Sequence, residues 1–315
     1  MSQNRKKRVA RAFALWQRSR MTIRNWFWVL ALGFGWGASF LFNAILLRDI
    51  GPLSVSALRI ALGAATCWAW VWATRKPVPW RPALAAQMLF LGLANYGIPF
   101  AIYPMAQQYV TSGVAGIVNA MMPIMVVIVS HFWPGGEKAT AGRSLGILFG
   151  FAGIVVLTLP AVGRGAESQV WAILFMLLAP ICYAVALNYL RRFHGLDTAV
   201  LAAMALTAGA VEMTPVMLAV EGVPHITSLA GWLSLIAIGV ALTGLSFIAM
   251  YALVGRVGAT NASTVTFVAP VSAVLLGALV LGDHVETEHL LGMALIFCGL
   301  AVLDGRLLTW RRRAN

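Results

Sequence analysis

One stretch of the chain occurs twice, and this internal repeat constrains the fold more than any other feature. Residues 91–127 match residues 238–274 without a gap when the sequence is compared with itself at an offset of 147 positions. The matched positions hold glycines, an aromatic residue and a proline: Gly92 with Gly239, Gly97 with Gly244, Phe100 with Phe247, and Pro123 with Pro270. A fixed offset that preserves such residues indicates a duplicated module. We therefore expect two copies of one fold, with the functional site where the copies meet.

Composition indicates that both copies lie in a lipid bilayer. Of the 315 residues, 60% are hydrophobic and 10% are charged, whereas about 25% of the residues in soluble proteins are charged. A helix needs about 20 apolar residues to cross the bilayer core. Ten segments meet this requirement: 26–47, 53–73, 83–104, 110–131, 145–162, 169–190, 198–220, 229–254, 258–281 and 289–308. The sequence predicts an all-α integral membrane protein with ten transmembrane helices.

The basic residues predict how these spans are oriented. Eight precede the first span, and most of the others lie in alternate loops or after the last span, whereas the opposite loops contain only Arg48 and Arg164. Cytoplasmic loops of membrane proteins collect Lys and Arg, so we expect both termini in the cytoplasm. The net charge of +13 then reflects topology, and no nucleic-acid partner is expected.

Each copy contains five spans, and this odd number inverts the second copy relative to the first. The predicted organisation is a basic cytoplasmic tail (1–25), a first five-helix repeat (26–162), a second, inverted five-helix repeat (163–308) and a second basic tail (309–315). Inverted repeats are typical of secondary transporters, in which the substrate binds near the membrane midplane and access alternates around it. This architecture favours a carrier.

Sequence motifs of the common enzyme classes are absent. The chain contains no GxxxxGK[ST], HExxH or GxSxG sequence, which argues against a nucleotide-driven pump, a zinc protease and a serine hydrolase. The five histidines lie near span ends or in loops, and the three cysteines lie in apolar runs. We predict no enzymatic activity, no catalytic residue, no metal site and no cofactor. A membrane-embedded enzyme and a non-transporting scaffold are the alternatives from other classes.

Glycines spaced four apart predict close contacts between helices. Gly33 and Gly37 follow this spacing in the first span, and Gly142, Gly146 and Gly150 follow it at the start of the fifth. Small residues at this spacing let two helices approach closely in lipid.

Aromatic and polar residues share single helical faces and predict the lining of a cavity. Spacings of four, three and four place Tyr96, Phe100, Tyr103 and Gln107 on one face of the third span. Each aromatic residue alone is compatible with simple helix packing, but rings mixed with amides and hydroxyls suit a pocket for an amphipathic or zwitterionic small molecule. The complete predicted lining is Trp36, Ser39, Asn43, Tyr96, Phe100, Tyr103, Gln107, Asn119, Tyr183, Phe247 and Tyr251.

Two prolines and two charges interrupt the apolar spans. Pro123 and Pro270 occupy equivalent mid-span positions and are hinge candidates, because proline removes a backbone hydrogen bond and kinks a helix. Arg59 and Glu212 are intramembrane charges at similar depth, and such charges are functional candidates. They are compatible with a structural ion pair or with Glu212 as a protonation site for coupling.

The segment 109–115 (YVTSGVA), followed by Pro123, Gly136-Glu137, Gly146 and Gly153, resembles the EamA-type proteins of the drug/metabolite transporter superfamily. The resemblance covers nearly the whole chain after residue 25 and is closest in the first copy. The second copy departs from the family pattern at Asp283, where glutamate is usual, and at Tyr183-Ala184, where Trp-Ala is usual. The resemblance implies a bacterial inner-membrane exporter whose cavity is lined by spans 1, 3, 4, 6, 8 and 9, with spans 5 and 10 at the periphery.

The expected function is that of a secondary transporter that exports small metabolites, above all neutral or aromatic amino acids, by alternating access. Its partners are the small-molecule substrate and the lipid bilayer. An exporter of hydrophobic drugs or cations is the alternative within transport. No sequence pattern here specifies the substrate, the coupling ion or the oligomeric state.

Overall fold

The computed structural model describes residues 22–136, 138–193, 195–257, 262 and 264–304. Within them the chain is helical, and eight helices or stacks of helices are long and apolar enough to cross a membrane. Two shorter apolar helical segments, Val265–Leu281 and Thr287–Leu303, complete a set of ten. The predicted all-helical membrane fold is confirmed. Most of the predicted tail 1–25 and all of the tail 309–315 lie outside the described residues.

The first five spans include two that are divided into shorter helices. Spans one, two and five are single helices: α2 (Ile23–Leu46), α3 (Pro52–Ala73) and α8 (Ala141–Gly163). Span three consists of α4 (Pro82–Gly92), the π-helical turn η1 (Leu93–Gly97) and α5 (Ile98–Ala106). Span four consists of α6 (Ser112–Asn119) and α7 (Met122–Phe132).

The second five spans follow the same plan with different interruptions. Span six consists of α9 (Glu167–Met176) and α10 (Leu178–Leu190), and span seven is α11 (Thr198–Val220). Span eight consists of α12 (Leu229–Ile236), the long π-helical segment η2 (Ala237–Leu245) and α13 (Ser246–Val257). Span nine consists of α15 (Val265–Leu276) and η3 (Gly277–Leu281), and span ten is α16 (Thr287–Asp304).

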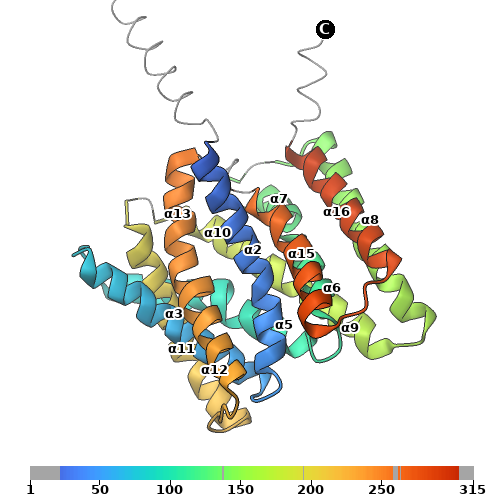
Figure 1. Cartoon of the computed structure of the whole chain (residues 1–315). Helices are drawn as coiled ribbons and strands as arrows, with labels where there is room; N and C mark the ends of the chain where they lie inside the picture. The colour runs from blue at the N-terminus through green and yellow to red at the C-terminus, as the bar shows by residue number, and fades with distance from the viewer. Residues whose placement is uncertain (1–21, 137, 194, 258–261, 263, 305–315) are drawn as a thin grey trace, which may run out of the picture.

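Most of the main helix contacts occur twice, once in each of two equivalent forms in which the spans of the first and second copies change places. Helix α2 packs on α15 as α10 packs on α7, and α3 packs on η2 as α11 packs on α4. Two further contacts join repeat-equivalent helices directly, α3 with α11 and α8 with α16. Figure 1 shows α8 and α16 side by side at one edge of the bundle. This pairing is what two interlocked copies of one module produce.

Glycine allows the closest of these contacts. A Cβ atom on Gly37 of α2 would lie 1.9 Å from Ser272 Oγ and 2.2 Å from the carbonyl oxygen of Ala269, both on α15. A Cβ atom on Gly33 would lie 2.4 Å from the Cβ of Val268. This geometry supports the predicted packing role of Gly33 and Gly37, because any side chain at these positions would force α2 and α15 apart.

The loops of the bundle lie at two opposite ends, which we call the tail end and the far end. The tail end is where the described chain begins, at α2, and ends, at α16, at the top of Figure 1. It also carries the loop 74–81 and residues 191–193 and 195–197. The far end carries the loops 47–51, 107–111, 164–166, 221–228 and 282–286.

A carboxylate at the tail end predicts a small acid-dependent loss of stability. Lys76 Nζ lies 2.9 Å from Asp197 Oδ2, and Asp197 also accepts a hydrogen bond from the backbone N–H of Ala199 at the start of α11. Burial raises the pKa of Asp197, but the hydrogen bonds from Lys76 and Ala199 outweigh burial and leave the pKa lowered. The stabilisation is therefore present above the unfolded pKa of about 3.9 and is lost as the pH falls through the folded pKa.

We expect Asp197→Asn to lower the thermal stability in detergent at pH 7 and to have a smaller effect at pH 3. Asparagine keeps the cap and removes only the charge, and solvent screening limits the pair to about 1 kcal/mol or less. Glu167→Gln, at an exposed carboxylate, is the control. An equal loss at both pH values would show that the charge contributes nothing.

Candidate functional site

Four aromatic side chains from the two copies form a continuous row of ring contacts. The Trp36 ring on α2 lies 6.1 Å from the Phe247 ring on α13, measured between centroids. Phe247 lies 5.3 Å from Tyr96 on η1, and Tyr96 lies 5.7 Å from Phe100 on α5. Tyr96 and Phe100 are buried, whereas Trp36 and Phe247 are partly buried. We call these four residues the aromatic row; all four belong to the predicted lining, and the row joins both copies.

The π-helical segments η1 and η2 overlap at repeat-equivalent positions. Residues 93–97 of η1 correspond to residues 240–244, which lie within η2, so Tyr96 and Thr243 are equivalent. Thr243 Oγ1 donates to the carbonyl oxygen of Ile238, 2.8 Å away. A π turn adds a residue to a helical turn and often marks a functional site. Thr243 was absent from the predicted lining, and its equivalence to Tyr96 was the signal that pointed to it.

Arg59 reaches the aromatic row from α3. Its guanidinium carbon lies 3.8 Å from the centroid of the Phe100 ring, a cation–π contact. Its Nε donates to Thr243 Oγ1 at 2.9 Å, and one terminal nitrogen lies 3.5 Å from Ser39 Oγ. Among the described residues, no ion pair joins Arg59 to Glu212, and the buried Oε2 of Glu212 has no hydrogen-bond partner. The structure thus gives Arg59 uncharged partners in place of the ion pair that its depth suggested.

Tyr103, Tyr183 and Asn119 border the same region. Tyr103 donates its hydroxyl to Asn119 Oδ1 at 2.8 Å, which links α5 to the end of α6. The Tyr103 ring packs edge-on against Phe40, with 5.3 Å between centroids. Tyr183 on α10 packs against two clusters of buried side chains, one that contains Tyr96 and Phe100 and one that contains Phe40 and Tyr103. Tyr103 and Asn119 are thus joined to each other, and Tyr183 packs beside both Tyr103 and the Phe100 end of the aromatic row.

Asn43 and Gln107 belong to a separate polar network nearer the far end. Asn43 Nδ2 donates to Gln107 Oε1 at 3.0 Å, and Gln107 Nε2 donates to the carbonyl oxygen of Phe40 at 2.8 Å and to Ser112 Oγ at 3.2 Å. The backbone N–H of Ser112 donates in turn to Asp283 Oδ2 at 3.2 Å. The network therefore runs from α2 to the segment 282–286.

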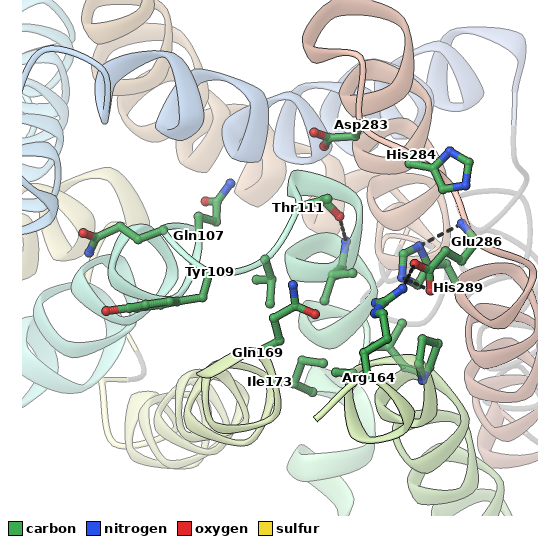
Figure 2. Close-up of a pocket in the computed structure, with 16 residues that line it drawn as sticks. Gln107, Tyr109, Thr111, Arg164, Gln169, Ile173, Asp283, His284, Glu286 and His289 are labelled. Carbon is green, nitrogen blue, oxygen red and sulfur yellow. Dashed lines mark hydrogen bonds and ion pairs between the residues drawn. The ribbon is translucent and has the colours of Figure 1, made fainter. Parts of the chain in front are cut away.

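A pocket of about 310 Å³ opens at the far end of this network. It lies between the 107–111 loop, α8, α9 and the segment 282–286, as Figure 2 shows. Its polar lining includes Gln107, Arg164, Gln169, Asp283, Glu286 and His289. The sequence did not predict this pocket, although acidic residues gather in the loops of this end.

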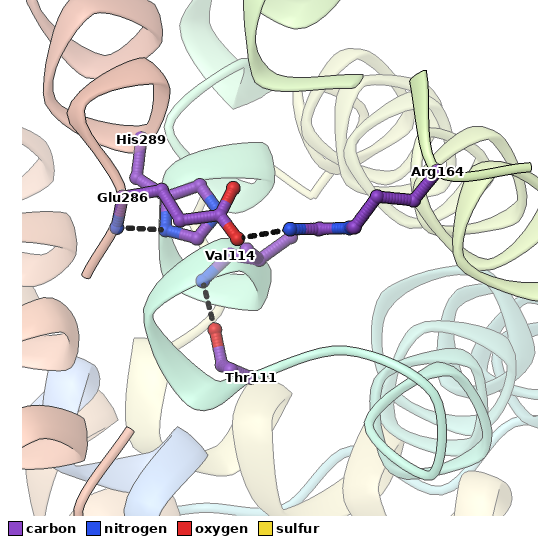
Figure 3. A network of polar contacts seen from close by, with 5 residues as sticks. All are labelled: Thr111, Val114, Arg164, Glu286 and His289. Atoms are coloured by element: carbon purple, nitrogen blue, oxygen red, sulfur yellow. Dashed lines mark hydrogen bonds and ion pairs between the residues drawn. The ribbon is translucent and has the colours of Figure 1, made fainter. Parts of the chain in front are cut away.

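Charges in the far-end pocket are partly paired. Arg164 forms an ion pair with Glu286, whose backbone N–H donates to His289 Nδ1 at 3.3 Å, as Figure 3 shows. The hydrogen bond from Arg164 lowers the pKa of Glu286. Burial raises the pKa of Asp283, and the hydrogen bond from Ser112 only partly opposes this. At neutral pH the pocket thus holds both charge signs and is suited to a polar or zwitterionic molecule.

Three carboxylates connect the copies at the far end. Glu221 accepts hydrogen bonds from the backbone N–H groups of Leu53 and Ser54 at the start of α3, at 2.9 and 2.8 Å. Asp49 accepts from the backbone N–H and the hydroxyl of Ser228, the N-cap of α12. Asp283 accepts from the start of α6, as described above. Each carboxylate comes from one copy and the helix from the other, where the helix dipole favours negative charge.

The two hinge candidates differ in their surroundings. Pro123 lies in the first turn of α7, after a break in span four at residues 120–121, whereas Pro270 lies inside α15. Tyr251 has its backbone in α13, but its side chain lies outside what the structure describes. The hinge roles and the lining role of Tyr251 stay predictions.

A model of the EamA-like transporter family matches residues 24–159 and, a second time, residues 170–303. The chain belongs to the EamA-like transporter family. It is therefore a multi-pass membrane transporter of the drug/metabolite transporter superfamily, and not an enzyme. The two matched segments agree with the two copies inferred from the sequence.

Similar proteins support this membership of the EamA-like family. The uncharacterized transporter YoaV of Bacillus subtilis is 28% identical over 272 residues, which cover 84% of this chain and 91% of YoaV. The uncharacterized inner membrane transporter YedA of Escherichia coli K12 is 29% identical over 276 residues, which cover 85% and 86% of the two chains. A solved crystal structure superposes with a TM-score of 0.63 at 24% identity, over 90% of this chain and 96% of the other. At that identity it shows the fold alone.

Proposed function

We propose that this EamA-like transporter exports small metabolites, above all neutral or aromatic amino acids, by alternating access between its two copies. The observation that carries the proposal is the aromatic row with Arg59 at its Phe100 end, because the row is built from both copies. Aromatic faces bind apolar and aromatic side chains, while the nearby hydroxyl and amide groups bind polar ones. The site therefore suits a molecule with an apolar body and a polar head.

The charge of the site distinguishes this proposal from its closest rival. An exporter of hydrophobic drugs or cations would gain from a negative group at the binding site. The charged group that the structure records against Phe100 of the aromatic row is instead the positive Arg59. Glu212 is the negative alternative, but it lies on α11 and no described contact links it to the row. Amino acids are therefore favoured over cations.

Orientation and direction belong to the same proposal. Basic residues gather at the tail end, which supports a cytoplasmic location for both termini. The relative YedA is described as an inner membrane transporter, and we assign this chain to the bacterial inner membrane. The far-end pocket then faces outward and serves as the exit. We further assign the repeats to 26–162 and 163–308, with Pro123 and Pro270 as hinges of their relative motion.

The decisive experiment offers labelled compounds to the purified protein in liposomes. Neutral, aromatic, acidic and basic amino acids, together with a lipophilic cation such as tetraphenylphosphonium, are tested with and without a pH gradient. Uptake of neutral or aromatic amino acids above that of empty liposomes supports the proposal. Transport of the cation alone would replace it with the drug-export function, and transport of none of the compounds would refute both.

Replacing one ring of the row is expected to weaken substrate binding. Phe247→Leu keeps an apolar side chain of similar size but removes the ring between Trp36 and Tyr96, and with it a ring contact to an aromatic substrate worth about 1 kcal/mol. We expect the KM for an aromatic amino acid to rise about 3- to 10-fold with the protein still folded. Phe132→Leu, at a residue that is 79% exposed, should leave KM unchanged. Equal KM values for the Phe247 variant and the wild type would remove the aromatic row from the binding site.

A further inference from the structure

Arg59 holds a positive charge for which no residue in the described part of the chain supplies a counter-ion. It lies about two turns from the start of α3, and the residue is only 8% exposed. Among the described residues, no carboxylate pairs with its guanidinium. Burying an unpaired charge at membrane depth costs several kcal/mol, and such charges face the protein interior or a water-filled cavity. A buried charge without a counter-ion at membrane depth is therefore a candidate for a functional role.

The contacts of Arg59 fix the guanidinium without neutralising it. Thr243 accepts from Nε, Ser39 lies near one terminal nitrogen, and the Phe100 ring covers one face of the plane. These partners come from three elements, η2, α2 and α5, and all of them are uncharged. The second terminal nitrogen, Nη1, makes no hydrogen bond to a described residue. The charged group is therefore oriented in advance, with donor capacity left over.

We propose that Arg59 binds the carboxylate of the transported molecule and that the apolar body of that molecule lies along the aromatic row. The inference rests on the proposed function and narrows its substrate class to carboxylates with an apolar or aromatic substituent. A planar guanidinium binds a carboxylate through two parallel hydrogen bonds, an arrangement that lysine cannot reproduce. Tyr183, which packs against the cluster that contains Tyr96 and Phe100, would add a hydroxyl donor.

Because Arg59 lies at one end of the aromatic row, the carboxylate and the apolar body of one substrate molecule can be bound at the same time. The guanidinium stacks on Phe100, the end ring, and the row continues through Tyr96 and Phe247 to Trp36. A carboxylate held at Arg59 directs the rest of the molecule towards these rings. A purely structural clamp between α3, α2 and η2 would show no preference for one ligand head group over another. Ligand discrimination therefore separates the two roles.

The test compares ligands that differ only in the head group. Binding of L-phenylalanine, 3-phenylpropionate and phenethylamine to the purified full-length protein is measured by calorimetry or by competition. The wild type is expected to bind the two carboxylates about 10- to 100-fold more tightly than the amine, the range of one charge-assisted interaction. Arg59→Gln should lose this preference and bind phenethylamine no more weakly than the wild type. Arg59→Lys should retain part of the preference, and Arg48→Gln, at an exposed arginine, should retain all of it.

Each outcome bears on one of the two proposals. Equal binding of carboxylates and amine by the wild type would overturn the carboxylate site even if Arg59→Gln does not fold, and it would leave amino-acid transport standing. A preference that persists in Arg59→Gln would overturn it as well. Binding of 3-phenylpropionate that depends on Arg59, without transport of any amino acid, would keep the carboxylate site and refute the amino-acid proposal. If the wild type binds neither L-phenylalanine nor 3-phenylpropionate, the proposed carboxylate site is overturned.

Discussion

Gly146→Leu is expected to prevent stable folding, because Gly146 lies where α8 and α16 are in backbone contact. A Cβ atom on Gly146 would lie 2.7 Å from the carbonyl oxygen of Gly299, and a Cβ atom on Gly299 would lie 2.6 Å from the carbonyl oxygen of Gly146. Backbone atoms cannot move aside as a flexible side chain can. The helices must separate, with a loss of about 3 kcal/mol or more.

The repeat makes a second, independent prediction from the same contact. Gly146 corresponds to Gly292 and Gly153 to Gly299 at an offset of 146, so the contact of Gly146 with Gly299 is mirrored by that of Gly153 with Gly292. A Cβ atom on Gly292 would lie 2.9 Å from the carbonyl oxygen of Gly153. Gly292→Leu should therefore destabilise the protein about as much as Gly146→Leu, although the two residues lie in different repeats.

A matched control exists in the same helix. A Cβ atom on Gly163, in the last turn of α8, would meet no atom within 4 Å. Gly163→Leu should leave the yield of monodisperse protein and its melting temperature in detergent unchanged, whereas Gly146→Leu and Gly292→Leu should lower both sharply. Wild-type melting of either contact variant would show that α8 and α16 do not depend on this close approach.

The sequence predicted the fold well because lipid imposes simple rules on a chain. A span needs about 20 apolar residues, and Lys and Arg mark one side of the membrane. The offset that aligns Gly92 with Gly239 and Pro123 with Pro270 then reveals two copies. Glycine spacing also carried information about contacts, as Gly37 and Gly146 show. Each of these signals is local in the sequence or repeats at a fixed interval.

The arrangement of the site was harder to predict, because it depends on where helices deviate from ideal geometry. The spacing placed Tyr96 and Gln107 on one face of a regular helix, but Tyr96 lies in a π turn at residues 93–97 and Gln107 is the C-cap that follows α5. In the structure Tyr96 lies in the aromatic row, whereas Gln107 bonds to Asn43 nearer the far end. No residue type in this stretch specifies a π turn, so the sequence could not reveal the division.

Charges at depth illustrate a second limit. Arg59 and Glu212 lie at similar depth in equivalent helices, and depth alone is compatible with an ion pair. Whether two side chains meet depends on the rotation of each helix about its axis, which packing across the repeat interface determines. Thr243 approaches Arg59 only because η2 packs on α3. Spacing within one span does not contain that information.

The N-terminus of α3 shows why an acid from the other copy is needed at the far end. The N-cap position of α3 is Gly51, which has no side chain to accept from the first N–H groups of the helix. Glu221, at the end of α11, supplies the acceptors: Oε1 accepts from Leu53, and Oε2 accepts from the N–H and the hydroxyl of Ser54. A carboxylate is well suited here because it has only acceptors and is favoured by the helix dipole.

Glu221→Gln is therefore expected to destabilise the protein by about 1.5–3 kcal/mol, the range for hydrogen bonds to a charged group. Glutamine has the same shape but keeps one acceptor oxygen, so its amide N–H groups would face backbone donors. Thermal melting in detergent measures the loss. Glu167→Gln, at an exposed carboxylate of the same end, should change nothing.

Gly51→Ala tests the same cap without altering the acid. A Cβ atom on Gly51 would lie 2.3 Å from the carboxyl carbon of Glu221, and the φ angle of Gly51 is −70°, which alanine adopts without strain. The variant should thus act only by displacing the carboxylate. Because both substitutions break one contact, the double variant should be little less stable than either single one. Additive losses in the double variant would mean that Glu221 and Gly51 act separately, and that the carboxylate of one copy does not cap the helix of the other.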